Sequence, residues 1–177
     1  MSEILMDNLE AFTSLTSEIA GSGNVAIRVI EKNETICFLE GEKCTLEEII
    51  AKVENAQEEP SDPFAIGEEF YIDLDEKYRL FNHSCSPNTY IKGENEMIAI
   101  RRIEIGEEIT FDYSTTMHYP EEKIIASGHQ LWTCDCLCGS KNCRGIIDQF
   151  KTLTPKEQAF YLENKYMPDF MLKLFEK

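Results

Sequence analysis

The sequence predicts a mainly β domain with short helices, and three observations support that fold class. Several short stretches are rich in Val, Ile, Phe and Tyr and are separated by Gly, Asn and Pro, which is typical of strands joined by turns. Only two segments combine helical spacing of apolar residues with a capping signal. The chain has 177 residues, so it can bury the core of one domain and carry a small appendage.

The first predicted elements lie between residues 25 and 57. Residues 25–41 alternate and are rich in Val and Ile, and Asn33 sits where a tight turn would divide them. We therefore expect two paired strands there. A short helix is expected over 45–57, because Thr45 and Glu48 have the spacing of a capping box. Its apolar face would carry Leu46, Ile49, Ile50 and Val53.

More short strands are expected in the middle of the chain, at residues 70–74, 89–92, 96–103 and 107–113. Turns at 93–95 and 105–106 would join the last three. In the last strand, Ile109, Phe111 and Tyr113 fall on one face because strand side chains alternate. Residues 114–133 show no clear period and are interpreted as a linker.

The two ends of the chain differ in how clearly they are predicted. Thr154 and Glu157 form a second capping box, with Pro155 at the first helical position, so a C-terminal helix is expected. Near the N-terminus the apolar residues are spaced three to four apart, which indicates a helix, although Phe12–Thr16 also suits a strand. The residues with this spacing are Leu5, Leu9, Phe12, Leu15 and Ile19.

The charge of the chain excludes some partners. Its formal net charge is −16, and residues 148–177 hold five acidic and five basic residues, which leaves 28 acidic against 12 basic residues before them. Such a field repels phosphate backbones and anionic lipids, so we expect no direct nucleic-acid partner and no membrane partner. With no targeting segment and no long apolar run, a cytoplasmic location is expected, and delivery into a host cell or the nucleus stays open.

A cysteine cluster indicates a metal site. Four of the seven cysteines lie at Cys134, Cys136, Cys138 and Cys143, and tetrahedral zinc suits three thiolates in one tight loop. The fourth ligand would be Cys134 or a residue elsewhere, with Cys85 as a candidate. The alternative is a set of free or disulfide-bonded thiols, which would leave one cysteine unpaired. Four other residues are interpreted as buried thiols or surface histidines rather than ligands: Cys37, Cys44, His118 and His129.

Four motifs in order carry a family resemblance. Residues 79–85 read R-L-F-N-H-S-C, 108–113 read E-I-T-F-D-Y, 136–145 contain C-L-C-G and C-R-G, and 21–26 open with G-S-G. Together they resemble the SET-domain protein-lysine methyltransferases with a post-SET zinc motif, of a compact bacterial or viral type. The resemblance spans residues 17–147, and four ordered motifs are much more specific than a lone G-x-G pair.

The resemblance implies a fold and a division of the chain. The fold would be the β-clip-like, pseudoknotted SET domain, in which the Asn82–His83 segment threads through a loop near the last strand, plus a zinc loop and a C-terminal helix. It also implies a strand just before Gly21. We expect a SET domain at 1–133, a post-SET zinc-binding motif at 134–147 and a helical extension at 148–177.

The resemblance also implies roles for individual residues. Tyr113 would be the catalytic residue, and S-adenosylmethionine and zinc would be the cofactors. The cofactor-binding residues would be Gly21, Ser22, Gly23, Tyr71, Arg79, Asn82, His83, Tyr113 and Leu137. The substrate channel would be lined by Tyr71, Phe111 and Tyr113, and the zinc ligands would be Cys85, Cys136, Cys138 and Cys143. Phe at position 111 is typical of family members that add two or three methyl groups.

The expected substrate is a basic, lysine-containing protein of histone or ribosomal type. Residues 40–62 contain eight acidic and two basic residues, and 68–76 contain five acidic residues, so a basic peptide would be attracted, although such runs are often only solvated surface. Two other functions stay open: a catalytically silent SET-like module that binds a lysine peptide, and a zinc-stapled interaction domain. A homodimer could form through the apolar residues of the C-terminal helix, Met167, Phe170, Met171, Leu174 and Phe175.

Overall fold

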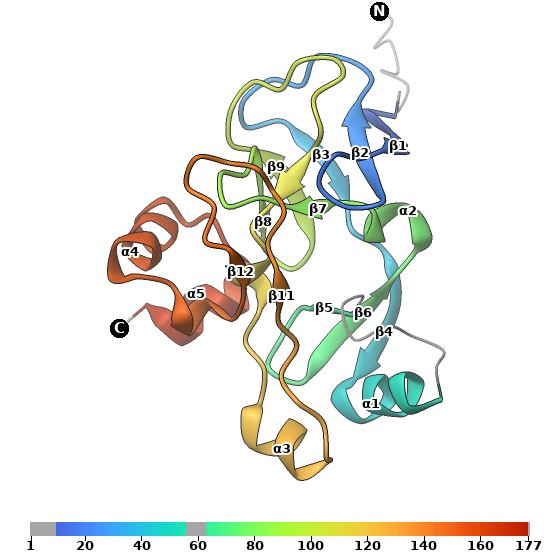
Figure 1. The fold of residues 1–177 in the computed structure, drawn as a ribbon, viewed down its shortest axis with the longest axis vertical. Helices are drawn as coiled ribbons and strands as arrows, with labels where there is room; N and C mark the ends of the chain where they lie inside the picture. The colour runs from blue at the N-terminus through green and yellow to red at the C-terminus, as the bar shows by residue number, and fades with distance from the viewer. Residues whose placement is uncertain (1–9, 56–62, 177) are drawn as a thin grey trace, which may run out of the picture.

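The structure is a computed structural model that describes residues 10–55 and 63–176. The expectations for Leu5, Leu9 and the end of the helix at 45–57 lie outside those residues. Small sheets form the centre of the molecule, α1 and α3 lie toward one end, and α4 and α5 pack on one side (Figure 1). The mainly β fold class with short helices is confirmed.

The first two strands form an antiparallel ribbon. β1 (Phe12–Thr16) pairs with β2 (Ser22–Ala26), with Phe12 opposite Ala26. Gly21 has a φ of 47°, a left-handed conformation that glycine adopts without steric cost and that turns the chain between the strands. The strand that the resemblance implies before Gly21 is therefore confirmed.

Residues 25–41 do not form the two paired strands that the sequence predicts, so that prediction is wrong. The later half, β3 (Thr35–Phe38), pairs with β9 (Glu96–Ala99), and Ile30 bridges to Ile103. Asn33 adopts a left-handed φ of 67°, as the turn requires, but its N–H donates to Ala99 at 2.9 Å. The residues before and after the turn at Asn33 therefore both pair with residues 96–103. Their backbone groups form hydrogen bonds with that segment instead of with each other.

β8 (Thr89–Lys92) completes this sheet, in the order β3-β9-β8. β9 ends at Ala99, earlier than predicted, because residues beyond it turn toward the isolated bridge at Ile103. A second sheet has the order β4-β6-β5, built from Gly41–Thr45, Phe70–Leu74 and Pro63–Ala65. α1 (Leu46–Glu54) follows β4 directly and has the predicted capping box of Thr45 and Glu48.

The close contact of β4 with β6 gives a stability prediction at Gly41. A Cβ atom there would lie 2.0 Å from the backbone oxygen of Asp73, so the strands would have to separate. We expect Gly41→Ala to lower the free energy of unfolding by about 1–3 kcal/mol, measured by urea denaturation. Gly67→Ala is the matched control, since its Cβ would meet only ordinary contacts, 3.6 Å from the Phe70 ring. Equal losses in both variants would contradict this explanation.

Two short strands bring distant segments together at the centre. β7 (Asn82–His83) pairs in parallel with β10 (Thr110–Phe111), which is only part of the predicted strand at 107–113. Before this stretch, the N–H of Ile109 donates to Asn24 in β2 at 2.8 Å. After it the chain tightens into the 3-10 turn η1 (Tyr113–Thr116). α2 (Glu76–Arg79) precedes β7 in the chain. The segments β2, β7 and β10 therefore lie together just before η1.

The predicted linker and C-terminal region contain more structure than the sequence indicates. α3 (Glu121–Ala126) interrupts the linker, and β11 (Cys134–Asp135) pairs with β12 (Ile146–Ile147). A 3-10 turn, η2 (Phe150–Thr152), is followed by two helices instead of one, α4 (Pro155–Asn164) and α5 (Asp169–Phe175). Lys165, with a φ of 54°, and Pro168 separate the two, because neither conformation continues a helix.

The C-terminal helices bury their apolar residues within the chain. Met167 and Met171 are fully buried and form one cluster with Phe150, Leu153 and Tyr161. Met167 and Met171 are among the residues predicted to form a dimer contact, but here they are buried within the chain. Homodimerisation stays a prediction, and these two methionines do not support it. The capping box of Thr154 and Glu157, with Pro155 at the first turn, is confirmed.

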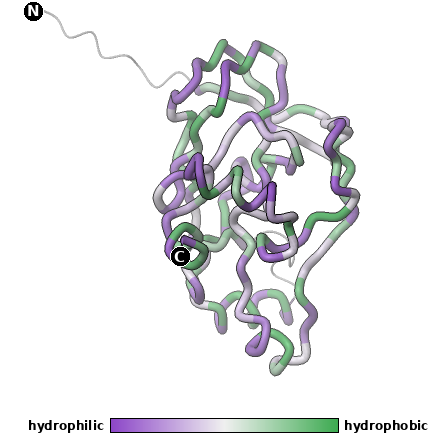
Figure 2. Tube along the Cα trace, turned by 90° about the vertical axis from the view of Figure 1, so that its left-hand side faces the viewer, coloured by the Kyte–Doolittle hydropathy of each residue, from purple (hydrophilic) through white to green (hydrophobic). Residues whose placement is uncertain are grey.

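The main core lies between the β1-β2 ribbon, the two sheets and α2. Its fully buried members include Ile30, Leu39, Phe81, Ile91 and Ile109. Polar and apolar residues are interspersed along the described trace (Figure 2). Among residues 10–55 and 63–176, every helix is too short or too polar to cross a bilayer.

Candidate functional site

A cavity of about 150 Å³ lies beside the start of η1 and is lined mainly by aromatic side chains. It collects residues from the β4-β6-β5 sheet, from α2, from β10 and η1, and from the segment before β11. The aromatic lining consists of Phe64, Tyr78, Phe81, Phe111, Tyr113, Tyr119 and Trp132. A cavity with such walls excludes water from a ligand and weakens the solvation of any charge inside it.

Tyr113 carries the most distinctive polar group on this cavity. Its hydroxyl donates to the backbone oxygen of Phe81 at 2.7 Å, so two oxygen atoms from different segments converge there. The Tyr113 ring packs against Phe111 and Trp132, with ring centroids 4.8 and 6.5 Å away. The structure therefore brings the predicted catalytic tyrosine and the predicted channel residue Phe111 into one cavity.

Asn82 and the Gly21–Gly23 turn, predicted as cofactor-binding residues, lie in contact. The Asn82 amide donates to the backbone oxygen of Ser22 at 2.9 Å and to Oε1 of Glu108 at 2.7 Å. A Cβ atom on Gly23 would lie 2.1 Å from Oε1 of Glu108 and 3.0 Å from the Asn82 amide nitrogen. Only glycine at position 23 allows this close approach, so the turn packs directly against β7.

Arg79 lies on the wall of the same cavity and is held by the preceding strand. Its guanidinium donates to the backbone oxygen of Leu74 and pairs with Asp73 at 2.6 Å. Leu137, another predicted cofactor residue, lines neither this cavity nor the one described next, and the residue is 66% exposed. Of the predicted cofactor residues, Arg79 and Tyr113 therefore line this cavity, the Gly21–Gly23 turn contacts Asn82 beside it, and Leu137 lies apart.

Tyr71 lines a second cavity, of about 120 Å³, instead of the first. The two cavities share three wall residues, Pro63, Tyr119 and Trp132. The Tyr71 hydroxyl is buried and has no hydrogen-bond partner among the described residues. Burial raises the pKa of this phenol above its ordinary value, so the group stays protonated and can donate.

The predicted zinc cysteines lie together beneath the site. Ligand atoms of His83, Cys85, Cys136 and Cys138 all lie within 4.8 Å of one another, and the Cys85 and Cys136 sulfur atoms are 3.7 Å apart. The Cys143 thiol lies next to them, since its sulfur contacts the backbone oxygen of Cys136 at 3.6 Å. Three or four sulfur donors in one place are the chemistry that tetrahedral Zn²⁺ prefers, so the residues fit the metal.

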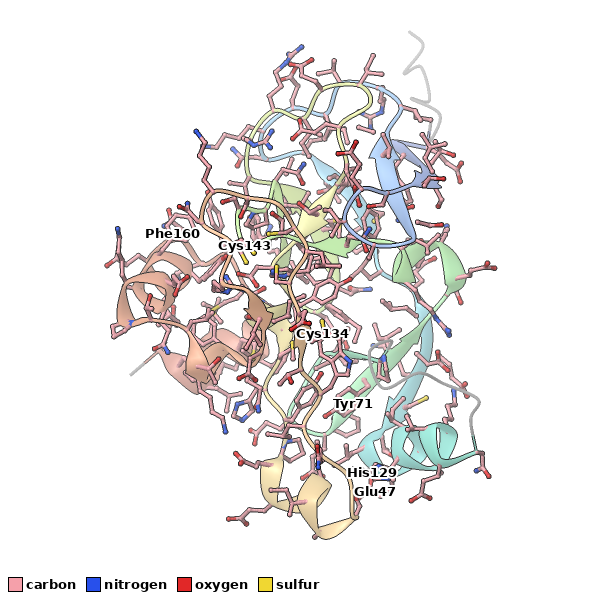
Figure 3. The ribbon with its side chains drawn as sticks, viewed as in Figure 1. Glu47, Tyr71, His129, Cys134, Cys143 and Phe160 are labelled. Carbon is pink, nitrogen blue, oxygen red and sulfur yellow. The ribbon has the colours of Figure 1, made fainter. Side chains whose placement is uncertain are left out.

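The candidate fourth ligands can be compared. Cys134 is outside the cluster, because β11 pairs it with Ile147, and in Figure 3 it lies lower than Cys143, toward α3.

Burial favours the neutral thiol in the cluster and raises the pKa of Cys85 to about 11. Burial acts the same way on Cys138, but hydrogen bonds with Ser140 and neighbouring groups overcome it and lower the pKa to about 6. The Cys138 thiol therefore loses its proton more easily than an ordinary cysteine.

His83 stands between the cysteine cluster and Tyr113. Its Nδ1 accepts the N–H of Tyr113 at 3.2 Å, so the ring proton belongs on Nε2, which lies 3.2 Å from the Cys85 sulfur. Burial lowers the pKa of His83 to about 4 despite the nearby Asp112, so the ring is neutral. In this tautomer His83 donates to the sulfur of Cys85, and Cys143 stays the predicted fourth ligand.

A buried polar network that sequence reasoning missed connects the site to the C-terminal helices. Arg144 makes two 2.7 Å contacts with the two oxygens of Asp112, and the Tyr161 hydroxyl of α4 donates to Asp112 at 2.6 Å. Asp112 lies in the E-I-T-F-D-Y motif and Arg144 in the C-R-G motif, so the sequence motifs contained both residues of the ion pair. Tyr161 had no sequence signal, and neither had Trp132.

This network gives a second stability prediction. Asp112 is fully buried, so removing the guanidinium in Arg144→Leu would leave an uncompensated charge. We expect the free energy of unfolding to fall by about 3–5 kcal/mol, measured by urea denaturation. Arg102→Leu is the control, because its pairs with Glu31 and Glu104 are exposed and should contribute at most about 1 kcal/mol. A loss in Arg144→Leu no larger than in the control would exclude a structural role for the pair.

Comparisons with known proteins agree with the geometry. A family model described as "SET domain" matches residues 21–114, more than half of the chain. The chain is 40% identical over 77 residues to histone-lysine N-methyltransferase set-2 of Caenorhabditis elegans, covering 40% of this chain and 4% of that protein. It is 32% identical over 144 residues to histone-lysine N-methyltransferase trithorax of Drosophila virilis, covering 75% of this chain and 3% of that protein. The chain therefore spans only a small part of the length of these relatives.

Solved structures show the same fold. The methyltransferase domain of human histone-lysine N-methyltransferase SETMAR superposes with a TM-score of 0.61 at 21% identity, covering 78% of this chain and 58% of that chain. A Polycomb complex in an autoinhibited conformation bound to S-adenosylmethionine gives a TM-score of 0.58 at 21% identity, covering 67% of this chain and 17% of that one. At these identities the likeness concerns the fold alone.

Proposed function

The chain belongs to the SET domain family, and from this we propose that it is a protein-lysine methyltransferase that transfers methyl groups from S-adenosylmethionine to lysine side chains of a basic protein. The observation that carries the proposal is the convergence of the Tyr113 hydroxyl and the Phe81 carbonyl on one aromatic cavity. The cavity adjoins the Asn82–His83 segment and the cysteine cluster. The relatives named above as histone-lysine methyltransferases support the choice of reaction.

The aromatic walls account for how a lysine could become a nucleophile. A free lysine has a pKa near 10.4, so its amine is charged at neutral pH and cannot attack. Burial between Phe111, Trp132 and Tyr113 would disfavour the ammonium and lower that pKa. The oxygens of Tyr113 and Phe81 would then orient the neutral amine, and alignment of the reacting atoms supplies most of the rate enhancement.

The residues around β7 fit the cofactor. The Gly21–Gly23 turn packs closely against Asn82, and a side chain at position 23 would collide with Glu108 and Asn82 and displace the turn. Gly21, Ser22, Gly23, Asn82 and the His83 backbone would hold S-adenosylmethionine, with Arg79 on the adjoining wall. When bound, the cofactor would supply an electrophilic methyl group. The role of this chain is to hold the donor at one end of the cavity and the amine at the other.

Zinc held by Cys85, Cys136, Cys138 and Cys143 would connect the two halves of the site. Cys85 lies two residues after the end of β7, and the other three cysteines lie in the loop between β11 and β12. A metal shared by both segments would fix this loop against the cofactor-binding strand. Metal binding and order in the site would then be coupled.

The charge supports a basic protein substrate such as a histone tail or a ribosomal protein. The net charge of −16 attracts a lysine-rich peptide and repels DNA.

The proposal is tested in two steps. Titration calorimetry should detect S-adenosylmethionine binding, which a zinc-stapled interaction domain would not give. Radiolabelled methyl transfer to a pool of histones and ribosomal proteins should then separate the enzyme from a silent lysine-peptide module.

Phe111 gives a prediction about the product. It is buried, and its ring lies on the cavity wall between Phe64 and Tyr113. A phenylalanine adds no hydroxyl that would occupy space or bind the amine, so we expect the wild type to add two or three methyl groups. Phe111→Tyr should shift the product toward monomethyl-lysine, as measured by mass spectrometry. Only monomethyl product from the wild type would contradict the prediction.

A further inference from the structure

The second cavity is an apolar groove beside the proposed lysine cavity. One side is the apolar face of α1, with Ile49, Ile50 and Val53, and the other is Ile124 of α3. Pro63, Tyr119 and Trp132 line both cavities, so the two are separated only by shared side chains. A side chain close in sequence to a lysine in the first cavity would therefore be within reach of the second.

The floor of this groove carries a buried group that has no partner. Tyr71 is 2% exposed, and its hydroxyl has no hydrogen bond among the described residues. A buried hydroxyl without a partner is costly, and a bound main-chain carbonyl would satisfy it. The Tyr71 hydroxyl is therefore a polar group on an otherwise apolar surface, and an acceptor on a ligand would satisfy it.

The rim of the groove is mainly acidic. Oε1 of Glu54 lies 3.4 Å from Nε2 of His129, and Glu69 forms an ion pair with Lys123. The negative charge of Glu47 also contributes to raising the pKa of Lys123. Figure 3 shows Glu47 and His129 at the end of the molecule where α1 and α3 lie, with Tyr71 toward the centre. Three carboxylates against one lysine and a histidine attract a peptide that carries positive charge around an apolar residue.

We propose that this groove binds an apolar side chain of the substrate, one to three residues from the methylated lysine, while the Tyr71 hydroxyl donates to a main-chain carbonyl of the same peptide. The inference rests on the proposed function and adds the sequence class of the substrate. The apolar lining disfavours a charged side chain in the groove because no buried partner for it is present among the described lining residues. The preferred substrate is therefore a basic segment with one large aliphatic or aromatic residue close to its lysine.

The test uses the full chain and a peptide library with one fixed lysine in a background of Ser and Arg. Leucine or glycine is placed in turn at each position from three before to three after the lysine. For at least one position, the wild type should methylate the leucine peptide with a kcat/KM about 10-fold or more above the glycine peptide. Equal rates at every position would overturn the proposal.

Two variants of α1 make the test specific. Val53 lines the groove, so Val53→Trp should fill it and reduce the kcat/KM of the leucine peptide to that of the glycine peptide. Ala51 is exposed on the same helix, so Ala51→Trp is the size-matched control and should keep the preference. A preference that survives in Val53→Trp would overturn the proposal.

Tyr71→Phe tests the hydroxyl separately. Because that hydroxyl has no partner among the described residues, its removal should leave the melting temperature equal or higher while KM for the leucine peptide rises several-fold. An unchanged KM would exclude the proposed hydrogen bond. Failure of the underlying function would look different, since no peptide and no histone would then be methylated.

Discussion

Replacing Tyr113 by phenylalanine is expected to lower the kcat for lysine methylation by about 100-fold or more, the scale of losing one oriented polar group in a transition state. The hydroxyl lies 2.7 Å from the Phe81 oxygen, at the point where the amine would meet the methyl group. Phenylalanine keeps the aromatic wall, so the shape of the cavity should persist. The loss should therefore appear in kcat, measured by radiolabelled methyl transfer, with little change in S-adenosylmethionine affinity by calorimetry.

Tyr90→Phe is the matched control for this substitution. Tyr90 stacks on Tyr166, with ring centroids 4.6 Å apart, and lines neither of the two cavities in the part of the chain that the structure describes. It should keep the wild-type rate. Tyr113→Phe also removes a hydrogen bond, which contributes about 1 kcal/mol, so its stability should be compared by urea denaturation. Equal methylation by both variants would show that the Tyr113 hydroxyl has no catalytic role.

The sequence predicts local structure well where neighbouring residues determine it. The capping boxes at Thr45 and Thr154 both form, since each needs only side chains three residues apart. Asn33 adopts the left-handed conformation that its turn requires. These features follow from short-range sterics and hydrogen bonds, so a single sequence contains all the information for them.

Pairing between distant segments could not be predicted in the same way. β3 pairs with β9 and not with the segment before Asn33, because residues 96–103 supply a partner for both. The parallel pairing of β7 with β10 covers two residues on each side, too short for any periodic signal. Only the family resemblance predicted that the Asn82–His83 segment lies near the last strand, and in the structure it pairs with β10.

The site shows the same division. Motifs identified Asn82, Tyr113 and the clustered cysteines, because each lies in a short, spaced pattern. Trp132 and Tyr161 lie outside those patterns, and they reach the site through the path of the linker and through α4. Tyr71 lay inside a predicted strand, but which cavity its side chain would line depends on how β6 packs against α1.

Removing one zinc ligand is the second change with a large expected effect. The Cys85 sulfur lies 3.7 Å from that of Cys136, across the interface between the β7 segment and the β11-β12 loop. Metal analysis of the wild type should find about one zinc per chain, as expected for a closed site with four ligands. Cys85→Ser should lower the zinc content and weaken S-adenosylmethionine binding together, since the proposed metal would join the loop to the strand that would hold the cofactor.

Cys134→Ser separates metal binding from a general effect of losing a cysteine. Cys134 pairs with Ile147 in β11-β12 and lies outside the cluster of His83, Cys85, Cys136 and Cys138. The zinc content of Cys134→Ser should therefore equal that of the wild type. Retained zinc in Cys85→Ser together with loss in Cys134→Ser would reverse the assignment of the fourth ligand. His83 donates to the Cys85 sulfur and accepts from the Tyr113 backbone. Loss of that sulfur should therefore also disturb Tyr113, and methyl transfer should fall further than cofactor binding alone would explain.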